Sequence, residues 1–401
     1  MKRLCYILML LVLACTTSCI EEYNELPDDQ AERMVVIDGQ IVGESECTFM
    51  LRYSAPLDDM STLAYKVITD AQVAVVGSNG VTYVGHQTFD RPGRYVVKVG
   101  KLDPEVSYSL EVNCSEGSFV SRPMLPLDAP DITEFCYEQP REDRLVDFYI
   151  STADPQALVY YRWDFQETWE IFTPYKCYWS YAFDNPSAFE QWDPGNKDQA
   201  VPTGRFVYIG EEGLKNHGWC KNTSKDLLFA SNIDYGQGAI QRRCLYQLNP
   251  DNNRFQTRYL THVRQMAISA EEYEYLHLLA TQSSEMGGLF TPMPSELPSN
   301  ISGLDGSRAI GFIGVRGHIG ESEIYINRKE VDHNDLYTVK IVADSLAEEP
   351  PYMLKRGYRI IDYNPYMGTV SWSNRWAVDC TDNFWGASLE RPDYWIDEKK
   401  D

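Results

Sequence analysis

The chain has 401 residues, of which 43% are hydrophobic and 24% charged, and its formal net charge is −23 at pH 7. This length is enough for two or three globular domains. The strong negative charge argues against a nucleic-acid partner, because binding to phosphate groups requires a basic surface.

Residues 1–18 predict a lipoprotein signal peptide. Lys2 and Arg3 give a positive start, and residues 4–14 are almost wholly apolar. The apolar run is shorter than the about 20 residues that a membrane-spanning helix needs, which favours a cleaved signal. We therefore expect export and removal of this segment from the mature protein.

Two cysteines are candidates for the lipid that would anchor the mature protein. The residues before Cys15 are closer to the usual lipoprotein signature, whereas Cys19 is followed at once by Glu21 and Glu22. We predict lipidation at Cys19, because acids behind the acylated cysteine resemble the export signal of Bacteroidetes-type surface lipoproteins. Acyl chains contribute about 0.8 kcal/mol per buried CH₂, so several would hold the protein on the outer membrane. Residues 19–32 are then an acidic tether.

Residues 33–126 have the pattern of an antiparallel β-sandwich. Apolar residues alternate with polar ones over 106–113, as in strands with one buried face. Asn79-Gly80 lies between two apolar runs and predicts a tight hairpin. The spacing of Leu102 and Tyr108 resembles a tyrosine corner, in which the hydroxyl bonds to backbone near Leu102. We expect an immunoglobulin- or fibronectin-III-like sandwich.

Residues 127–401 predict a larger and more irregular β-rich domain with loop insertions. Ser269 and Glu272 have the spacing of a capping box, so a short helix is expected to begin there. Residues 176–203 and 211–236 are loop-rich, and loops of this length are usually functional or flexible. Four apolar runs predict strands, at 145–150, 158–165, 205–210 and 258–268. The whole chain is therefore expected to be mainly β.

Aromatic residues are frequent, with 27 Tyr and 9 Trp. Such a content suits both β-sheets and binding surfaces. Strand periodicity places Tyr161 and Trp163 on one face, and burial in the core is the favoured interpretation for Trp163. The functional hypothesis places Trp169, Trp179 and Tyr181 around a ligand or partner surface.

Seven cysteines remain beyond the signal and the anchor: Cys47, Cys114, Cys136, Cys177, Cys220, Cys244 and Cys380. Export permits disulfides, and an odd number leaves at least one thiol unpaired. Cys177 and Cys220 flank the loop-rich insertion, so one hypothesis joins them in a disulfide. The alternative is that they are separate buried thiols, and the sequence does not decide between the two.

No catalytic or metal-binding motif stands out in the chain. HExxH, GxSxG and phosphate-loop patterns are absent, so no catalytic residue, metal or cofactor is predicted. This favours a protein that is not an enzyme. A surface hydrolase remains the weaker alternative, because the carboxylate pair of a glycoside hydrolase is not local in sequence.

Several segments, taken in order, resemble the lipoproteins of the domain-of-unknown-function 4249 family. They are VVIDGQIV (35–42), GRYVVKVGKLDPEVSYSLEVN (93–113), YYRWDFQETWEIF (160–172), the block 269–303, and the C-terminal Asp379-Cys380 and 392–395. The resemblance implies a surface lipoprotein encoded beside TonB-dependent outer-membrane transporters. It implies an accessory or substrate-binding role as the partner of such a transporter, and no activity. An adhesin or structural surface protein is the alternative.

Overall fold

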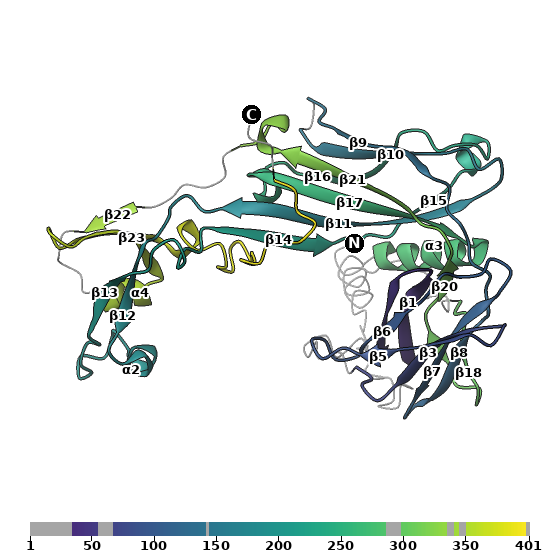
Figure 1. Ribbon diagram of the computed structural model, residues 1–401, viewed down its shortest axis with the longest axis horizontal. Coiled ribbons are helices and arrows are strands. Elements are labelled where there is room, and N and C mark those ends of the chain that lie inside the picture. The colour runs from purple at the N-terminus through teal and green to yellow at the C-terminus, as the bar shows by residue number, and fades with distance from the viewer. Residues whose placement is uncertain are drawn as a thin grey trace, which may run out of the picture.

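The computed structural model describes residues 34–54, 67–141, 144–285, 298–334, 341–344 and 350–397. The expectation of a mainly β protein is confirmed. Three units make up the molecule, an N-terminal sandwich, a central sandwich and a distal lobe (Figure 1). The predicted signal peptide, Cys19 and the tether 19–32 lie outside the described residues. In the described part of the chain, no helix is long and apolar enough to cross a membrane.

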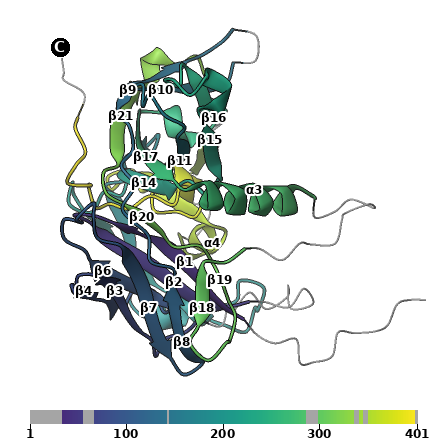
Figure 2. The same ribbon diagram turned by 90° about the vertical axis from the view of Figure 1, so that its right-hand side faces the viewer.

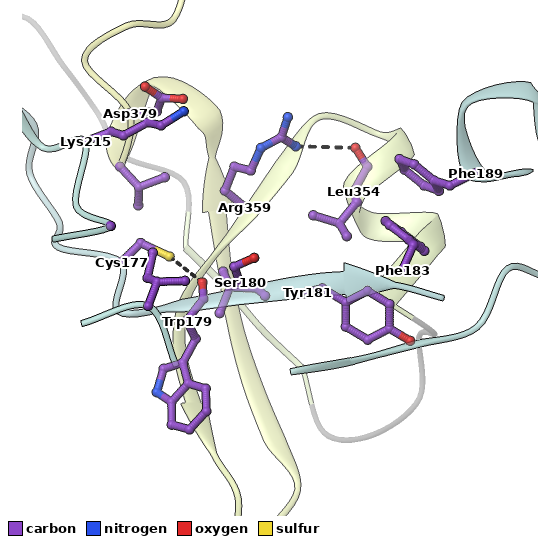
Figure 3. A pocket seen from close by; sticks show the side chains of 14 residues that line it. Cys177, Trp179, Ser180, Tyr181, Phe183, Phe189, Lys215, Leu354, Arg359 and Asp379 are labelled. Atoms are coloured by element: carbon purple, nitrogen blue, oxygen red, sulfur yellow. Dashed lines mark hydrogen bonds between the residues drawn. The ribbon is translucent and has the colours of Figure 1, made fainter. Parts of the chain in front are cut away.

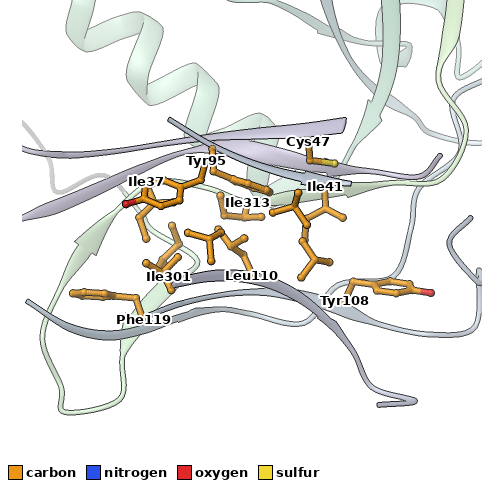
Figure 4. Packing of buried hydrophobic residues seen from close by; sticks show 14 of the residues in the cluster. Ile37, Ile41, Cys47, Tyr95, Tyr108, Leu110, Phe119, Ile301 and Ile313 are labelled. Carbon is orange, nitrogen blue, oxygen red and sulfur yellow. The ribbon is translucent and has the colours of Figure 1, made fainter. Parts of the chain in front are cut away.

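The N-terminal sandwich consists of two sheets that face each other across an apolar core (Figure 4). One sheet has the strand order β19-β1-β2-β6-β5, and the other has the order β18-β8-β7-β3-β4. The strands from the first part of the chain are β1 (Val35–Val42), β2 (Glu46–Tyr53), β3 (Gln72–Gly77), β4 (Thr82–Val84), β5 (His86–Gln87), β6 (Arg94–Lys98), β7 (Tyr108–Cys114) and β8 (Gly117–Ser121). As the alternation predicts, Tyr108, Leu110 and Val112 are buried in this core.

Three short strands that come much later in the chain complete this sandwich. They are β18 (Ile301–Gly303), β19 (Ala309–Ile310) and β20 (Gly314–Arg316). β18 pairs with β8, whereas β19 and β20 run parallel to β1. Ile301 of β18, Val315 of β20 and Ile313 just before β20 are buried in the sandwich core. The sequence placed these residues in the larger domain, so the range 33–126 does not hold every strand of the sandwich. Strand pairing between distant segments is the exception in folds and leaves no local pattern.

The tyrosine corner is present. The backbone N–H of Asp103 donates to the Tyr108 hydroxyl at 2.9 Å, and the Tyr108 side chain is buried. Tyr108→Phe keeps the ring and deletes this bond, so we expect the free energy of unfolding to fall by about 1 kcal/mol. Urea denaturation measures the change.

Tyr53→Phe is the matched control for the corner. The Tyr53 hydroxyl donates to Glu116 at 2.8 Å at the surface, where water replaces the lost bond. Its cost should stay below about 0.5 kcal/mol. Equal effects of the two substitutions would contradict a structural role for the corner.

The Asn79-Gly80 hairpin forms between β3 and β4, but its loop is longer than the predicted two-residue turn. The N–H of Gly77 donates to the carbonyl of Val81, which leaves residues 78–80 as the loop. Gly80 alone of the pair has a positive φ, at 86°, and the Asn79 side chain instead accepts from Val81 N–H. Three-residue loops with a left-handed residue are the next commonest hairpin connection.

The central sandwich has a long sheet of order β14-β11-β17-β21, with β15 also on β11, and a short sheet of order β16-β10-β9. Its strands are β9 (Ile132–Glu138), β10 (Val146–Thr152), β11 (Tyr160–Phe172), β14 (His217–Thr223), β15 (Leu228–Ser231), β16 (Arg243–Leu248), β17 (Arg258–Ile268) and β21 (Gly320–Asn327). Tyr161 and Trp163 stack at 5.5 Å in the core between the sheets. The interpretation of Trp163 as core is confirmed, and its indole N–H donates to Gln265.

Helix α3 (Ala270–Glu285) lies where the central and N-terminal sandwiches meet (Figure 2). The helix begins where predicted, and half of the capping box is seen: the Ser269 hydroxyl accepts from the N–H of Glu272, whereas the Glu272 carboxylate turns to another partner. The Glu272 carboxylate pairs with Arg316 of β20 at 2.6 Å, and Arg162 of β11 is 3.8 Å away. Glu272 is 2% exposed and Arg316 is 0% exposed. We call these two residues the junction ion pair; with Arg162, they link elements of both sandwiches.

The distal lobe is built from two insertions into the central sandwich, residues 173–216 and residues 341–374, and lies at the left of Figure 1. Its elements are β12 (Trp179–Phe183), α2 (Pro186–Gln191), β13 (Gly204–Tyr208), β22 (Ile341–Asp344), α4 (Pro350–Lys355), β23 (Tyr358–Asn364) and β24 (Thr369–Asn374). β12 pairs with β13, and β24 lies between β22 and β23. Part of the loop-rich range 176–203 is therefore ordered as β12 and α2. Short 3₁₀ helices elsewhere are η2 (Ile233–Tyr235), η3 (Asn253–Phe255), η4 (Arg328–Glu330) and η5 (Arg375–Ala377).

Residues 388–397 cross the outer face of the long central sheet, and we call them the C-terminal strap. Ser388 and Trp219 of β14 exchange backbone hydrogen bonds. Trp395 is buried against Trp219 and Leu260, and the Tyr325 hydroxyl donates to the carbonyl of Tyr394. The strap therefore covers apolar side chains on the face of the sheet that points away from the sandwich core.

Candidate functional site

A pocket of about 420 Å³ in the distal lobe is the candidate binding site (Figure 3). It lies among β12, α2, α4, β23 and the segments that lead back to the central sandwich. The lining residues are Cys177, Trp179, Ser180, Tyr181, Phe183, Phe189, Ile209, Gly213, Lys215, Leu354, Arg359, Ile360, Val378 and Asp379. A mainly apolar lining with a few polar groups is typical of a small-molecule site.

The aromatic wall of the pocket follows from the local structure of β12 and α2. Alternate residues of a strand point the same way, so Trp179, Tyr181 and Phe183 share a side of β12. The Asn185 side chain then accepts from the N–H of Ala188 and begins α2 directly after the strand. This sharp turn stacks Phe189 on Phe183, with 3.9 Å between the ring centroids.

Arg359 of β23 is the less exposed of the two cations that line the pocket, the other being Lys215. Its guanidinium donates to the backbone carbonyl of Tyr358 at 2.8 Å and to that of Leu354 at 3.4 Å. Among the residues that the structure describes, no carboxylate forms an ion pair with it. Burial and the neighbouring Arg375 lower the pKa of Arg359. The positive charge is therefore less well solvated here than at the surface.

The three aromatic residues proposed as one binding surface do not come together. Trp179 and Tyr181 line the pocket, whereas Trp169 is buried in the core of the central sandwich. The guanidinium of Arg254 lies 4.8 Å from the centroid of the Trp169 ring. Trp169 and Trp179 are close in sequence but not in space, because β11 ends between them and the chain then leaves the central sandwich for the distal lobe.

The hypothesis of a Cys177–Cys220 disulfide is wrong for this structure, in which the seven described cysteines are free. Cys177 borders the pocket and donates to the carbonyl of Trp179 at 2.9 Å. Cys220 is buried in the central sandwich, donates to the carbonyl of Trp385 and has a pKa raised by burial to about 12. The two residues belong to different apolar cores. This arrangement matches the alternative hypothesis, in which they are separate thiols.

A second cluster of charged and polar groups surrounds Glu167, but it has no free group for chemistry. The Glu167 carboxylate accepts from Arg254, the Tyr259 hydroxyl and the Asn222 side chain, at 2.6–3.1 Å. Each partner is held by the same carboxylate, so the cluster is a closed buried network. In the described ranges, no group of three or more His, Cys, Asp or Glu residues is placed to hold a metal ion.

The family model described as "Domain of unknown function (DUF4249)" matches residues 20–317. The chain belongs to this family. A search of curated proteins finds no match. Among solved structures, a DUF4785 family protein from Legionella pneumophila matches at 8% sequence identity and a TM-score of 0.18, covering 57% of this chain and 50% of that chain. The DUF4249 chain thus spans about half the length of that protein, and so low a TM-score carries no argument about fold or function.

The matched range stops before the second insertion of this DUF4249 protein, which supplies Leu354, Arg359 and Ile360 to the pocket lining. Sequence reasoning found Trp179 and Tyr181 but missed Phe183, Phe189 and Arg359. Arg359 had a usable signal, because it is a lone cation beside the apolar residues 360–361 in a strand. Phe189 had none, since its place over β12 depends on the turn at Asn185.

Proposed function

We propose that the protein is a surface-exposed outer-membrane lipoprotein, not an enzyme, that captures a small ligand as the partner of a TonB-dependent transporter. The observation that carries the proposal is the aromatic-walled pocket of about 420 Å³ in the distal lobe. Aromatic side chains supply large contact areas at low entropic cost, as binding sites require. The Cys19 region and the resemblance of the family to transporter-associated lipoproteins support the location and the partner.

The position of the pocket suits this role. The first described strand, β1, belongs to the N-terminal sandwich, so the proposed tether 19–32 would join the molecule there. The pocket lies at the opposite end of the long axis (Figure 1). A lipid anchor and tether would raise the effective concentration of the larger domain near a transporter, so that a weak contact suffices.

We expect a TonB-dependent transporter, identified by mass spectrometry, to co-purify with the tagged protein from outer membranes extracted in a gentle detergent. Protease added to intact cells should digest the protein, because surface placement leaves its loops accessible. The protease result follows from lipidation at Cys19 with acids behind it, and the co-purification follows from the resemblance to lipoproteins encoded beside such transporters.

Two cysteine variants provide the control. Cys19→Ser removes the proposed acyl acceptor and should abolish both results, whereas Cys15→Ser should leave both unchanged. Anchoring that depends on Cys15 would overturn the assignment of the lipid. Protection from protease on intact cells, or a protein that purifies alone beside an abundant transporter, would count against the proposed function.

A further inference from the structure

We propose that the distal pocket binds an apolar carboxylate, a small molecule whose flat hydrophobic body packs on the aromatic wall and whose carboxylate pairs with Arg359. This inference names the ligand class of the proposed site and rests on that function for its physiological use. Three observations carry it: a cation with no ion-pair partner among the described residues, neighbouring carboxylates that are paired with Arg375, and a lining that is otherwise mainly apolar.

The first observation is the charge of Arg359. Arg359 is half-buried, and its described partners are the backbone carbonyls of Leu354 and Tyr358, which carry no charge. A charge withdrawn from water is costly unless an opposite charge compensates it. A planar guanidinium recognises a carboxylate through two parallel hydrogen bonds, which neutral carbonyls do not replace. An incoming carboxylate would therefore provide the missing counter-charge.

The nearest carboxylates, those of Asp379 and Asp382, act on Arg359 only at longer range, and both are paired with Arg375. The Asp379 carboxylate accepts from Thr381 and lies 3.5 Å from Arg375. Asp382 lies 3.4 Å from the same Arg375. Lys215, the second cation of the lining, is exposed and well solvated. In a chain with a net charge of −23, a pocket cation that no described carboxylate pairs with is a local exception that favours an anion there.

The aromatic and aliphatic part of the lining favours an apolar body over a sugar. Phe183 stacks on Phe189, and Tyr181 meets Phe183 edge to face at 5.1 Å. Leu354 and Ile360 add aliphatic surface. Aromatic and aliphatic walls offer no hydrogen-bond partners to the ligand groups that face them, so burying several hydroxyl groups against them would cost free energy. A single carboxylate on a ring system fits both the charge and the wall.

Naphthalene-2-acetate and its neutral amide, naphthalene-2-acetamide, are matched probes for calorimetric titration of the full mature protein. We expect the acid to bind the natural protein about tenfold or more tightly than the amide, as a charge-assisted pair requires. Arg359→Met keeps the aliphatic stem and should remove this preference, leaving the amide unchanged. Arg359→Lys keeps the charge without the planar fork and should restore part of it.

Arg356→Met is the matched control, because Arg356 is exposed on the neighbouring turn and does not line the pocket. It should bind both probes as the natural protein does. If Arg359→Met unfolds, the comparison of acid and amide on the natural protein still decides. No binding of either probe, equal binding of both, or equal losses in the Arg356 and Arg359 variants would overturn the proposal. The Arg359 variants should still co-purify with a transporter, so a failure of the partner hypothesis is distinguishable from a failure here.

Discussion

Glu272→Gln should lower the free energy of unfolding by about 3–5 kcal/mol, because it leaves the Arg316 charge buried without its carboxylate. The substitution preserves side-chain volume and does not touch the cap, in which the backbone N–H of Glu272 donates to Ser269. The loss therefore reports the junction ion pair itself. Denaturation in guanidinium chloride, followed by fluorescence and far-UV circular dichroism, measures it.

Glu271, the residue before Glu272, provides a matched control. Glu271 pairs with Arg122 at the surface, where both side chains are more than half exposed. Glu271→Gln should cost less than about 1 kcal/mol, since exposed ion pairs contribute little. The double variant Glu272→Gln with Arg316→Met should be more stable than Glu272→Gln alone, because it removes the orphaned charge. Similar small effects at positions 271 and 272 would show that the junction ion pair is not structural.

Trp395→Ala should cost about 3–5 kcal/mol, the usual range for truncating a buried tryptophan. Trp395 is 3% exposed and packs on Trp219 and Leu260, and its ring meets Tyr325 edge to face at 5.7 Å. Its indole N–H is buried with no hydrogen-bond partner among the described residues. The substitution therefore removes packing without breaking a hydrogen bond. Thermal and chemical unfolding measure the cost.

A substitution at Ile396, the residue after Trp395, distinguishes the loss of packing from a general effect of changing the strap. Ile396 is 57% exposed, so Ile396→Ala should change stability by less than about 0.5 kcal/mol. If the two alanine variants behave alike, the C-terminal strap is a dispensable covering. If Trp395→Ala alone is destabilised, the outer face of the central sheet depends on the strap for its stability.

The sequence was sufficient where one local pattern decides the structure. The alternation around Leu110 predicted a half-buried strand, the spacing of Leu102 and Tyr108 predicted the corner, and Ser269 with Glu272 predicted the start of α3. Each of these features involves residues that are close along the chain, so period and spacing carry the information.

The sequence was insufficient where distant segments meet. Trp179 and Arg359 line one pocket although a whole sheet separates them along the chain, and no periodicity connects them. Trp169 was grouped with Trp179 because they are near in sequence, but the end of β11 sends them to different units. The disulfide hypothesis rests on Cys177 and Cys220 flanking one insertion, but the two residues belong to different cores.

The late strands of the N-terminal sandwich have a consequence for the order of assembly. Residues 122–300 lie between β8 and β18 and include most strands of the central sandwich. The ribosome therefore synthesises those strands before it reaches the last three strands of the N-terminal sandwich. Until β19 and β20 arrive, β1 keeps an open hydrogen-bonding edge, and Ile313 and Val315 are missing from the core. Open edges of this kind invite pairing with other chains during folding. The two sandwiches must therefore mature together, and a fragment cut at residue 126 lacks three strands of its own sandwich.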